Sequence, residues 1–263
     1  PYHAADNYIP RLISKGYKVA ICEQVEDPTL TKGITKREVV RVITPGIVQG
    51  EGILDEAENN FLVGLFPHPK GIGTAYLDIT TGEFNCLECA SNTELYALIN
   101  RLNCKEIVIP FESTLTIPEG ILVTPRPFVD TPRAEACLKI HFKVQNLSAF
   151  GLQNADNCYP AAWALLTYIL DTQKKLPLQL NRLCQVQSSQ QLLMDRVTVK
   201  NLELTDALHA ANTKGTLFWV LNHCKTAMGA RRLKSDLCQP STQLHWLNQR
   251  LDAVQTLKTD LLS

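Results

Sequence analysis

The order of apolar and polar positions divides the chain into three segments. In the first, residues 1–50, the pattern predicts a helix around 7–14, a strand at 18–22 and a β-branched strand at 39–44 that stops before a Pro-Gly pair. One helix and two strands bury little apolar surface, and a segment this small rarely folds alone. We therefore interpret it as the end of an α+β domain that begins outside this chain.

The second segment, residues 51–175, opens with an acidic, polar linker and continues as strands and helices. Strands are expected at 61–66, 73–78, 83–87, 106–109 and 121–124, and helices at 92–102, 133–142 and 161–172. Pro67 should stop the first strand, Gly82 should turn the following hairpin, and Asn92 or Thr93 should cap the first helix. A hairpin followed by alternating strands and helices predicts an α/β fold with a mixed sheet covered by helices.

The third segment, residues 176–263, is dominated by helical periods. An apolar face from Leu217 to Met228 predicts one helix, and Ser241 or Thr242 should cap the last one. That last helix carries an apolar stripe made of Leu244, Leu247, Leu251, Val254, Leu257 and Leu261. The stripe packs either on this chain or on residues beyond the C-terminus, and the pattern leaves both alternatives open. The segment predicts a partial all-α region.

Composition limits the function classes. The 26 basic residues balance the 26 acidic ones, so strong autonomous binding of a polyanion is not expected. Without an initiator methionine or a signal sequence before Pro1, the chain is expected to be an interior piece of a larger protein. No apolar run is long enough to span a membrane. The nine cysteines are scattered through apolar patterns, which indicates buried thiols in a reducing compartment, the cytoplasm.

Tests for metal and nucleotide chemistry are negative. Cys86 and Cys89 form the only CxxC, but residues three apart on a strand point to opposite faces, so no zinc site is expected. No Gly-Lys dipeptide occurs, which excludes a P-loop, and neither GxGxxG nor GxSxG is present. The sequence therefore predicts no catalytic residue and no metal ligand. The few basic clusters, such as the one around Lys36, are solvated faces or phosphate contacts.

Asp78 offers one enzymatic alternative. A strand ending in Asp before a hairpin resembles the first strand of RNase H-like nucleases, in which clustered carboxylates hold two metal ions. The simpler interpretation is that Asp78 satisfies the backbone of the turn. Further acids would be needed, but Glu106 is expected at the wrong end of its strand, and Asp171 is followed by two lysines. A metal-dependent nuclease built on Asp78 stays the alternative function.

A set of longer motifs runs through the whole chain in a fixed order. They are Pro1-Tyr2-His3-Ala4, residues 19–24 with Asp27-Pro28, Lys32-Gly33, residues 37–46, residues 73–82 with Phe84, Phe150-Gly151-Leu152, Asp171-Thr172-Gln173, residues 201–205, Gly215-Thr216-Leu217, and residues 226–233 with Pro240. In this order they resemble the MutS family of DNA mismatch-repair proteins. A relative specialised for recombination or strand junctions is disfavoured, because such relatives tend to lack the part that residues 1–28 resemble.

The resemblance implies a role for each segment. Residues 1–50 would close the mismatch-recognition domain, 51–175 would form a connector domain that is RNase H-like but non-catalytic, and 176–263 would begin the helical core. The family's Phe-x-Glu wedge, absent from this sequence, would precede Pro1, and the ATPase with its ATP and Mg would follow Ser263.

The resemblance also implies partners: a DNA duplex with a mismatch, the protein MutL, and a second copy of the parent protein in a homodimer. The chain itself would couple mismatch recognition to the ATPase. The residues expected near DNA are Pro1, Tyr2, His3, Lys32, Lys36 and Arg37.

Overall fold

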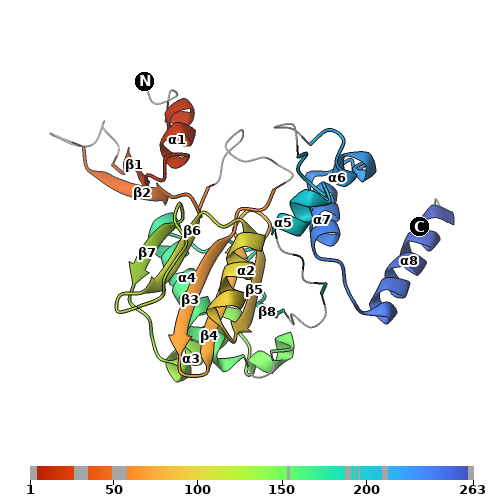
Figure 1. The fold of residues 1–263 in the computed structure, drawn as a ribbon. Coiled ribbons are helices and arrows are strands. Elements are labelled where there is room, and N and C mark those ends of the chain that lie inside the picture. The colour runs from red at the N-terminus through yellow and green to blue at the C-terminus, as the bar shows by residue number, and fades with distance from the viewer. Residues whose placement is uncertain are drawn as a thin grey trace. The chain divides into compact units, whose positions relative to one another are not determined.

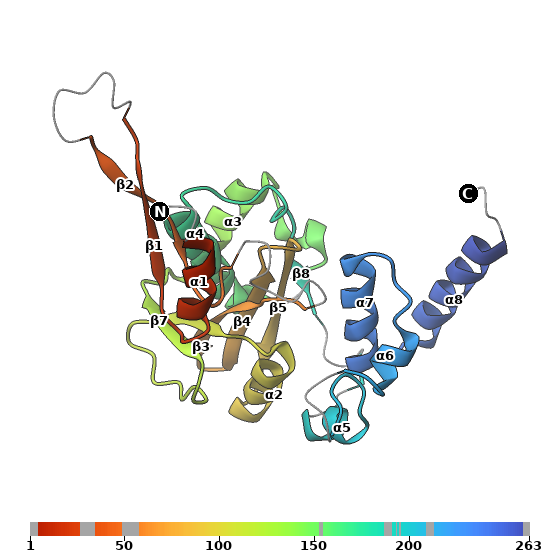
Figure 2. The same ribbon diagram turned by 90° about the horizontal axis from the view of Figure 1, so that it is seen from above.

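The computed structural model describes residues 5–26, 35–48, 58–152, 155–186, 191–192, 194, 196–208 and 213–259. The chain divides into two compact units, Pro1–Val186 and Gln187–Ser263, and the ribbon is drawn from two directions in Figures 1 and 2. No helix within the described ranges is both long and apolar enough to cross a membrane.

The first unit opens with a helix, α1 (Ala5–Ile13), and an antiparallel ribbon of β1 (Val19–Gln24) and β2 (Arg37–Ile43). α1 and the ribbon enclose a small core of their own around Ile9, Ile13, Ile43 and Val48. We call α1, β1, β2 and the residues up to 48 the N-terminal segment. The ribbon leaves one face open to solvent, so Cys22 is exposed and its predicted burial is wrong.

A six-stranded mixed sheet forms the centre of the first unit, as the α/β prediction requires. Its strands are β3 (Leu62–His68), β4 (Gly71–Asp78), β5 (Glu83–Cys89), β6 (Glu106–Pro110), β7 (Leu122–Arg126) and β8 (Cys184–Gln185), in the order β7-β6-β3-β4-β5-β8. β3, β4 and β5 are antiparallel neighbours, whereas β6 lies parallel to β3, β7 to β6, and β8 to β5. The short edge strand β8 has too few residues to show a pattern in the sequence.

Helices cover both faces of this sheet. They are α2 (Asn92–Leu102) on one face, and α3 (Thr131–Phe142) and α4 (Tyr159–Gln173) on the other (Figures 1 and 2). α4 is apolar nearly all round because it packs on β3 and β4 and also against α3. Its Leu165 and Ile169 are fully buried in the larger core, while Leu95 and Ile99 of α2 belong to the second core.

Two expectations about the first unit, one on the end of β3 and one on the cap of α2, are corrected. β3 does not stop at Pro67 but continues to His68; β6 pairs with β3 only along Leu62–Gly64, so beyond that point the missing N–H of proline faces no parallel partner. The cap of α2 is Ser91, whose hydroxyl accepts from the Glu94 amide at 3.3 Å. The Glu94 carboxylate in turn accepts from the Ala90 amide at 2.9 Å, so both side chains satisfy free donors at the helix start.

The second unit is helical in its described part. It contains α5 (Arg196–Asn201), α6 (Leu217–Leu221), α7 (Ala227–Cys238) and α8 (Leu244–Thr259). The single helix expected from Leu217 to Met228 is wrong: α6 ends at Leu221, and α7 begins behind Thr226, whose hydroxyl caps it by accepting from the Gly229 amide. α8 has no buried side chain: Leu244, Leu251, Val254 and Leu257 of its predicted apolar stripe are exposed, Leu247 is partly exposed, and Leu261 lies outside the described residues.

Candidate functional site

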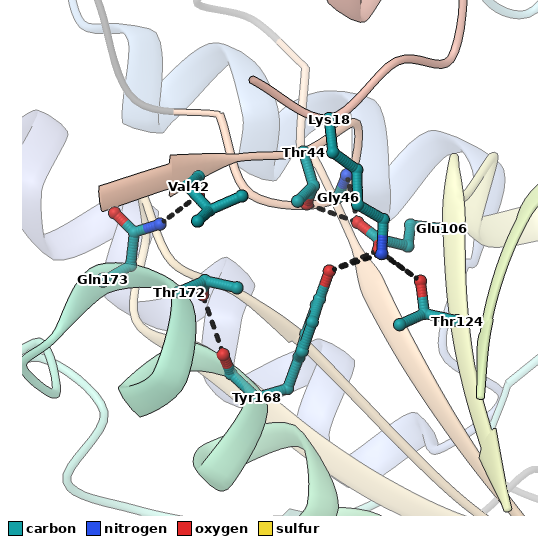
Figure 3. Close-up of polar contacts among 9 residues, drawn as sticks. All are labelled: Lys18, Val42, Thr44, Gly46, Glu106, Thr124, Tyr168, Thr172 and Gln173. Carbon is teal, nitrogen blue, oxygen red and sulfur yellow. Dashed lines mark hydrogen bonds and ion pairs between the residues drawn. The ribbon is translucent and has the colours of Figure 1, made fainter. Parts of the chain in front are cut away.

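Glu106, the first residue of β6, carries a buried carboxylate in the first unit. Its carboxylate has no exposure to solvent, and a buried charge is tolerated only when donors surround it. The donors come from both the N-terminal segment and the sheet. We call the cluster of Lys18, Thr44, Gly46, Glu106, Thr124 and Tyr168 the Glu106 joint (Figure 3).

One carboxylate oxygen, Oε2, is held by the turn that follows β2. The hydroxyl of Thr44 donates to it in a short hydrogen bond, and the amide of Gly46 donates at 3.1 Å. The turn is closed by mutual backbone bonds between Thr44 and Ile47, and Ile47 inserts into the larger core. Gly46 has no room for a side chain, since an added Cβ would lie 2.7 Å from Leu62 and 2.9 Å from the Cβ of Glu106.

The other oxygen, Oε1, is held by the sheet and α4. The hydroxyls of Thr124 and Tyr168 donate to it at 2.7 and 2.6 Å. Parallel pairing of β6 with β7 sets Glu106 opposite Leu122, so Thr124, two residues further on, projects from the same face. Burial and the negative charge of Glu106 raise the pKa of the Tyr168 hydroxyl, which keeps it protonated as a donor.

Lys18, directly before β1, supplies the positive charge. Its Nζ lies 3.4 Å from Oε1 of Glu106, and it donates to Thr124 at 2.8 Å and to the Tyr168 hydroxyl at 3.2 Å. Its side chain is 37% exposed, so the ammonium keeps part of its hydration while it neutralises the buried carboxylate. The ion pair therefore spans the boundary between the N-terminal segment and the sheet.

Two amide side chains extend this fastening along the same boundary. Gln173, at the end of α4, donates to the carbonyl of Val42 in β2 at 2.8 Å, and Asn60 donates to the carbonyl of Pro45 at 3.0 Å. In both bonds a side chain of the α/β domain donates to a backbone carbonyl of the N-terminal segment. The cluster contains no pair that resembles a nucleophile and its base. Its role is structural: a network of hydrogen bonds that holds the N-terminal segment against the sheet.

Asp78 is equally buried, and its partners are Thr80 in the same turn and Asn60 before β3. It accepts from the amide of Asn60 at 3.0 Å and from the amide and hydroxyl of Thr80 at 2.8 and 2.6 Å. The interpretation of Asp78 as a turn residue is confirmed, and the nuclease alternative has no support in these contacts.

The expected position of Glu106 is corrected. Leu62 is paired with Leu77 on one side and with Glu106 on the other, so Glu106 begins its strand at the same sheet edge where the strand of Asp78 ends. The alternation of side chains nevertheless directs Glu106 to the face of Leu77 and its neighbour Asp78 to the opposite face. The two carboxylates therefore do not form a metal-binding pair.

The CxxC cysteines also separate as predicted. Cys86 lies in the core beneath α3 and α4, and Cys89 in the core beneath α2. Within the described ranges, no group of three or more His, Cys, Asp or Glu side chains could hold a metal ion.

Of the residues expected near DNA, Pro1, Tyr2, His3 and Lys32 lie outside the described part of the chain. Lys36 and Arg37 are exposed at the start of β2. Lys36 forms an ion pair with Glu38 at 2.6 Å, and its hydrogen bond to Glu38 raises the pKa of the ammonium and lowers that of the carboxyl. The structure brings neither residue to the Glu106 joint.

The residues of the Glu106 joint were missed as a site. Thr44 and Gly46 belong to the motif of residues 37–46, where no contact with Glu106 was expected, and Glu106 was weighed only as a nuclease acid. One feature of the sequence could have indicated this site. Glu106 is a single carboxylate at the start of the apolar strand Ile107-Val108-Ile109, and a carboxylate in such a strand is expected to be buried. The partners could not be found in this way, because they come from four separate places in the sequence: Lys18, the turn at residues 44–46, Thr124 and Tyr168.

The chain thus contains three parts: an α+β segment, a mixed α/β domain to which buried polar bonds attach it, and a helical unit. This organisation defines a multidomain protein. Family models agree with this organisation: MutS domain I matches residues 1–52, MutS domain II residues 60–183, and MutS domain III residues 197–263. The chain belongs to the MutS family. The Glu106 joint thus links residues matched to domain I with residues matched to domain II.

Curated relatives support this assignment over nearly the whole chain. The DNA mismatch repair protein MutS of Dehalococcoides mccartyi is 43% identical over 258 residues, 97% of this chain and 30% of the relative. That of Lachnoclostridium phytofermentans is 38% identical over 273 residues, all of this chain and 29% of the relative. That of Methanosarcina barkeri is 37% identical over 279 residues, 98% of this chain and 31% of the relative. The chain spans about 30% of the length of these relatives.

Proposed function

We propose that this chain couples mismatch recognition to ATP hydrolysis in a MutS-type DNA mismatch-repair protein. The observation that carries the proposal is the succession of MutS domains I, II and III along the chain. The Glu106 joint supports it, because a relay between a DNA-reading domain and a distant ATPase needs firm attachment at each domain boundary.

The proposal assigns a part to each segment. Residues 1–50 close the mismatch-recognition domain, 51–175 form an RNase H-like connector without nuclease activity, and 176–263 begin the helical core. The order β5-β4-β3-β6-β7, with β5, β4 and β3 antiparallel and β6 and β7 parallel to β3, supports an RNase H-like connector. The mismatch wedge and the ATPase, with ATP and Mg, belong to other parts of the protein.

Partners and location follow from the same assignment. In the proposal the whole protein works in the cytoplasm as a homodimer on a duplex with a mismatch, and its connector docks MutL. Pro1, Tyr2, His3, Lys32, Lys36 and Arg37 lie near the DNA. Their contacts would be to phosphates, which position the duplex without reading its sequence.

Binding and ATPase measurements test the proposal. The intact protein is expected to prefer a duplex with one G·T mismatch over the matched duplex and to hydrolyse ATP faster when the mismatch is present. This chain alone is expected to bind both duplexes weakly and alike, as measured by fluorescence anisotropy, and to show no ATP binding in calorimetry. ATP hydrolysis by the chain alone, or indifference of the intact protein to the mismatch, would contradict the proposal.

Lys36→Ala and Arg37→Ala test the DNA-proximal residues in the intact protein. Each should weaken binding to matched and mismatched duplexes by a similar factor and reduce the salt dependence of binding by about one counterion. Lys139 on α3 is half-buried and pairs with Glu135 in the same helix. Lys139→Ala is the matched control and should leave binding unchanged.

A further inference from the structure

α8 is in contact with its own unit only near its start. Trp246, Leu247 and Arg250 are half-buried, and every other described residue of α8 is exposed. These three residues share one face of the helix, because side chains three and four positions apart are neighbours. Within the described residues, the contacts that set the direction of α8 are therefore confined to this short face.

Two arginines from two different helices meet at one carboxylate on this face. Asp236 of α7 accepts at Oδ2 from Nε of Arg232 in the same helix, at 3.2 Å, and from Nη1 of Arg250 in α8, at 2.6 Å. Its other oxygen, Oδ1, lies 3.1 Å from Nη2 of Arg232. Arg232 thus holds the carboxylate with two of its nitrogens, the geometry in which a partly exposed ion pair contributes most.

The ring of Trp246 faces the same two arginines. The guanidinium carbon of Arg250 lies 4.8 Å from the ring centroid, and that of Arg232 lies 5.8 Å from it, so both make cation–π contacts. Trp246 and Arg250 are four residues apart on α8, as Arg232 and Asp236 are on α7. We call these four residues the α7–α8 junction.

The α7–α8 junction contains two positive charges and one negative charge. Because both guanidiniums bind the same oxygen of Asp236, they lie close enough to repel each other, and the carboxylate offsets this repulsion. Among the described residues, neither Arg232 nor Arg250 pairs with a second carboxylate. Their side chains are 58% and 42% exposed, so dissolved salt can screen these charges.

We infer that Asp236 is the positioning residue that fixes the direction of α8 relative to α7. With its charge in place, the two arginines and the Trp246 ring are held together. Without that charge the arginines repel each other and α8 turns away from α7. This role follows from the contacts alone, whereas its use, to pass changes at the connector on toward the ATPase, rests on the proposed function.

Distance measurements between the two helices test this role in the intact protein. Spin labels on non-natural amino acids replace Met228 of α7 and Val254 of α8, which are both exposed, and double electron–electron resonance gives the distribution of distances. Labelled protein is diluted with unlabelled protein, so that only distances within one chain are read. In Asp236→Asn the population outside the wild-type distance should rise at least about fivefold, as expected when two guanidinium–carboxylate pairs are lost together.

Repulsion between the arginines predicts two ways to reverse this effect. Arg232→Gln combined with Asp236→Asn removes one of the two positive charges and should bring the distribution back toward that of the wild type. In Asp236→Asn at about 1 M salt, where the Debye length is about 3 Å, the distribution should narrow as well. Equal broadening in the single and the double variant, at low and at high salt, would show that Asp236 merely supports the fold of α7, and would overturn the inference.

Asp252→Asn is the matched control. Asp252 is exposed on α8, and within the described ranges its side chain has no ion pair. Its substitution removes the same charge from the same pair of helices and should leave the distribution of distances at that of the wild type. A distribution as broad in Asp252→Asn as in Asp236→Asn would also overturn the inference, because the position of the lost charge would then not matter.

Mismatch-stimulated ATP hydrolysis by the same variants tests the use of the α7–α8 junction. It should fall in Asp236→Asn and recover when Arg232→Gln is added. If the distances change as expected but hydrolysis does not, Asp236 positions α8 and its use in coupling fails. If the wild-type protein is itself indifferent to the mismatch, the proposed function fails, and the distances still decide the role of Asp236.

Discussion

The buried charge of Glu106 is stabilised by several hydrogen-bond donors that point at its carboxylate, and removal of any one donor by substitution tests this. Thr124→Val keeps the shape of the side chain but removes the hydroxyl that donates to Glu106 and accepts from Lys18. Because hydrogen bonds to a buried charge are the strong ones, the free energy of unfolding should fall by about 1.5–3 kcal/mol. Chemical denaturation monitored by circular dichroism measures the change.

Thr167→Val provides the comparison for this residue. The Thr167 hydroxyl donates only to the carbonyl of Ala164 in its own helix, at 2.9 Å, and that carbonyl lies within the helix ladder. Its loss should change the free energy of unfolding by no more than about 0.5 kcal/mol. A similar effect of both substitutions would argue against a special role for the charge on Glu106.

The cysteine thiols differ from one another chiefly in how deeply they are buried. Burial raises the pKa of Cys104 to about 12 and that of Cys89 to about 11, whereas Cys22 and Cys224 are exposed. At pH 8 roughly one molecule in 10⁴ would carry the Cys104 thiolate, the reactive form. Iodoacetamide should therefore label Cys22 and Cys224 in the native protein and reach Cys89 and Cys104 only after unfolding, as peptide mass spectrometry can follow. Early labelling of Cys104 would contradict the packing beneath α2.

At the scale of elements, the start of α2 separates two interpretations of the same sequence. The pattern predicted Asn92 or Thr93 as the cap, but the structure uses Ser91. Ser91→Ala should lower the free energy of unfolding by about 1 kcal/mol, because an amide in the first turn loses its acceptor. Thr93→Ala should cost less or even stabilise, since Thr93 is an exposed helical position where alanine is favoured. Thermal melts of both variants decide between the two caps, and a larger loss in Thr93→Ala would reverse the assignment.

At the scale of the whole molecule, the two units should respond separately to substitution. Leu165→Ala empties a fully buried position of α4 that packs against Gly64 of β3, and should lower the free energy of unfolding of the first unit by about 2–5 kcal/mol. Leu251→Gln changes an exposed position of α8, and should change stability by less than about 0.5 kcal/mol. Hydrogen exchange read by peptide assigns each effect to its unit. Faster exchange throughout α7 and α8 in Leu165→Ala would show that the units unfold together.

The strands and helices of the first unit could largely be predicted because their signals are local. Alternating apolar positions mark β3 to β5, Gly82 marks the hairpin turn with its positive φ of 76°, and the apolar run of α4 marks a covered helix. The predictions of the end of β3 and of a single helix from Leu217 to Met228 were wrong because contacts with neighbouring residues outweighed the local sequence preference. Pro67 is tolerated because its strand has lost a partner there, and Thr226 ends a helical pattern by capping a new helix.

The sequence by itself determined the class of the fold, the family and the absence of a P-loop, because these depend on patterns and motifs that are contiguous along the chain. Only the tertiary structure decided that Glu106 is a fastening and Asp78 a turn residue. Lys18 and Tyr168 stand 150 positions apart, and a carboxylate carries no mark of which distant donors will surround it. Strand register and the docking of α4 bring those donors together, and these arise from packing of the whole unit.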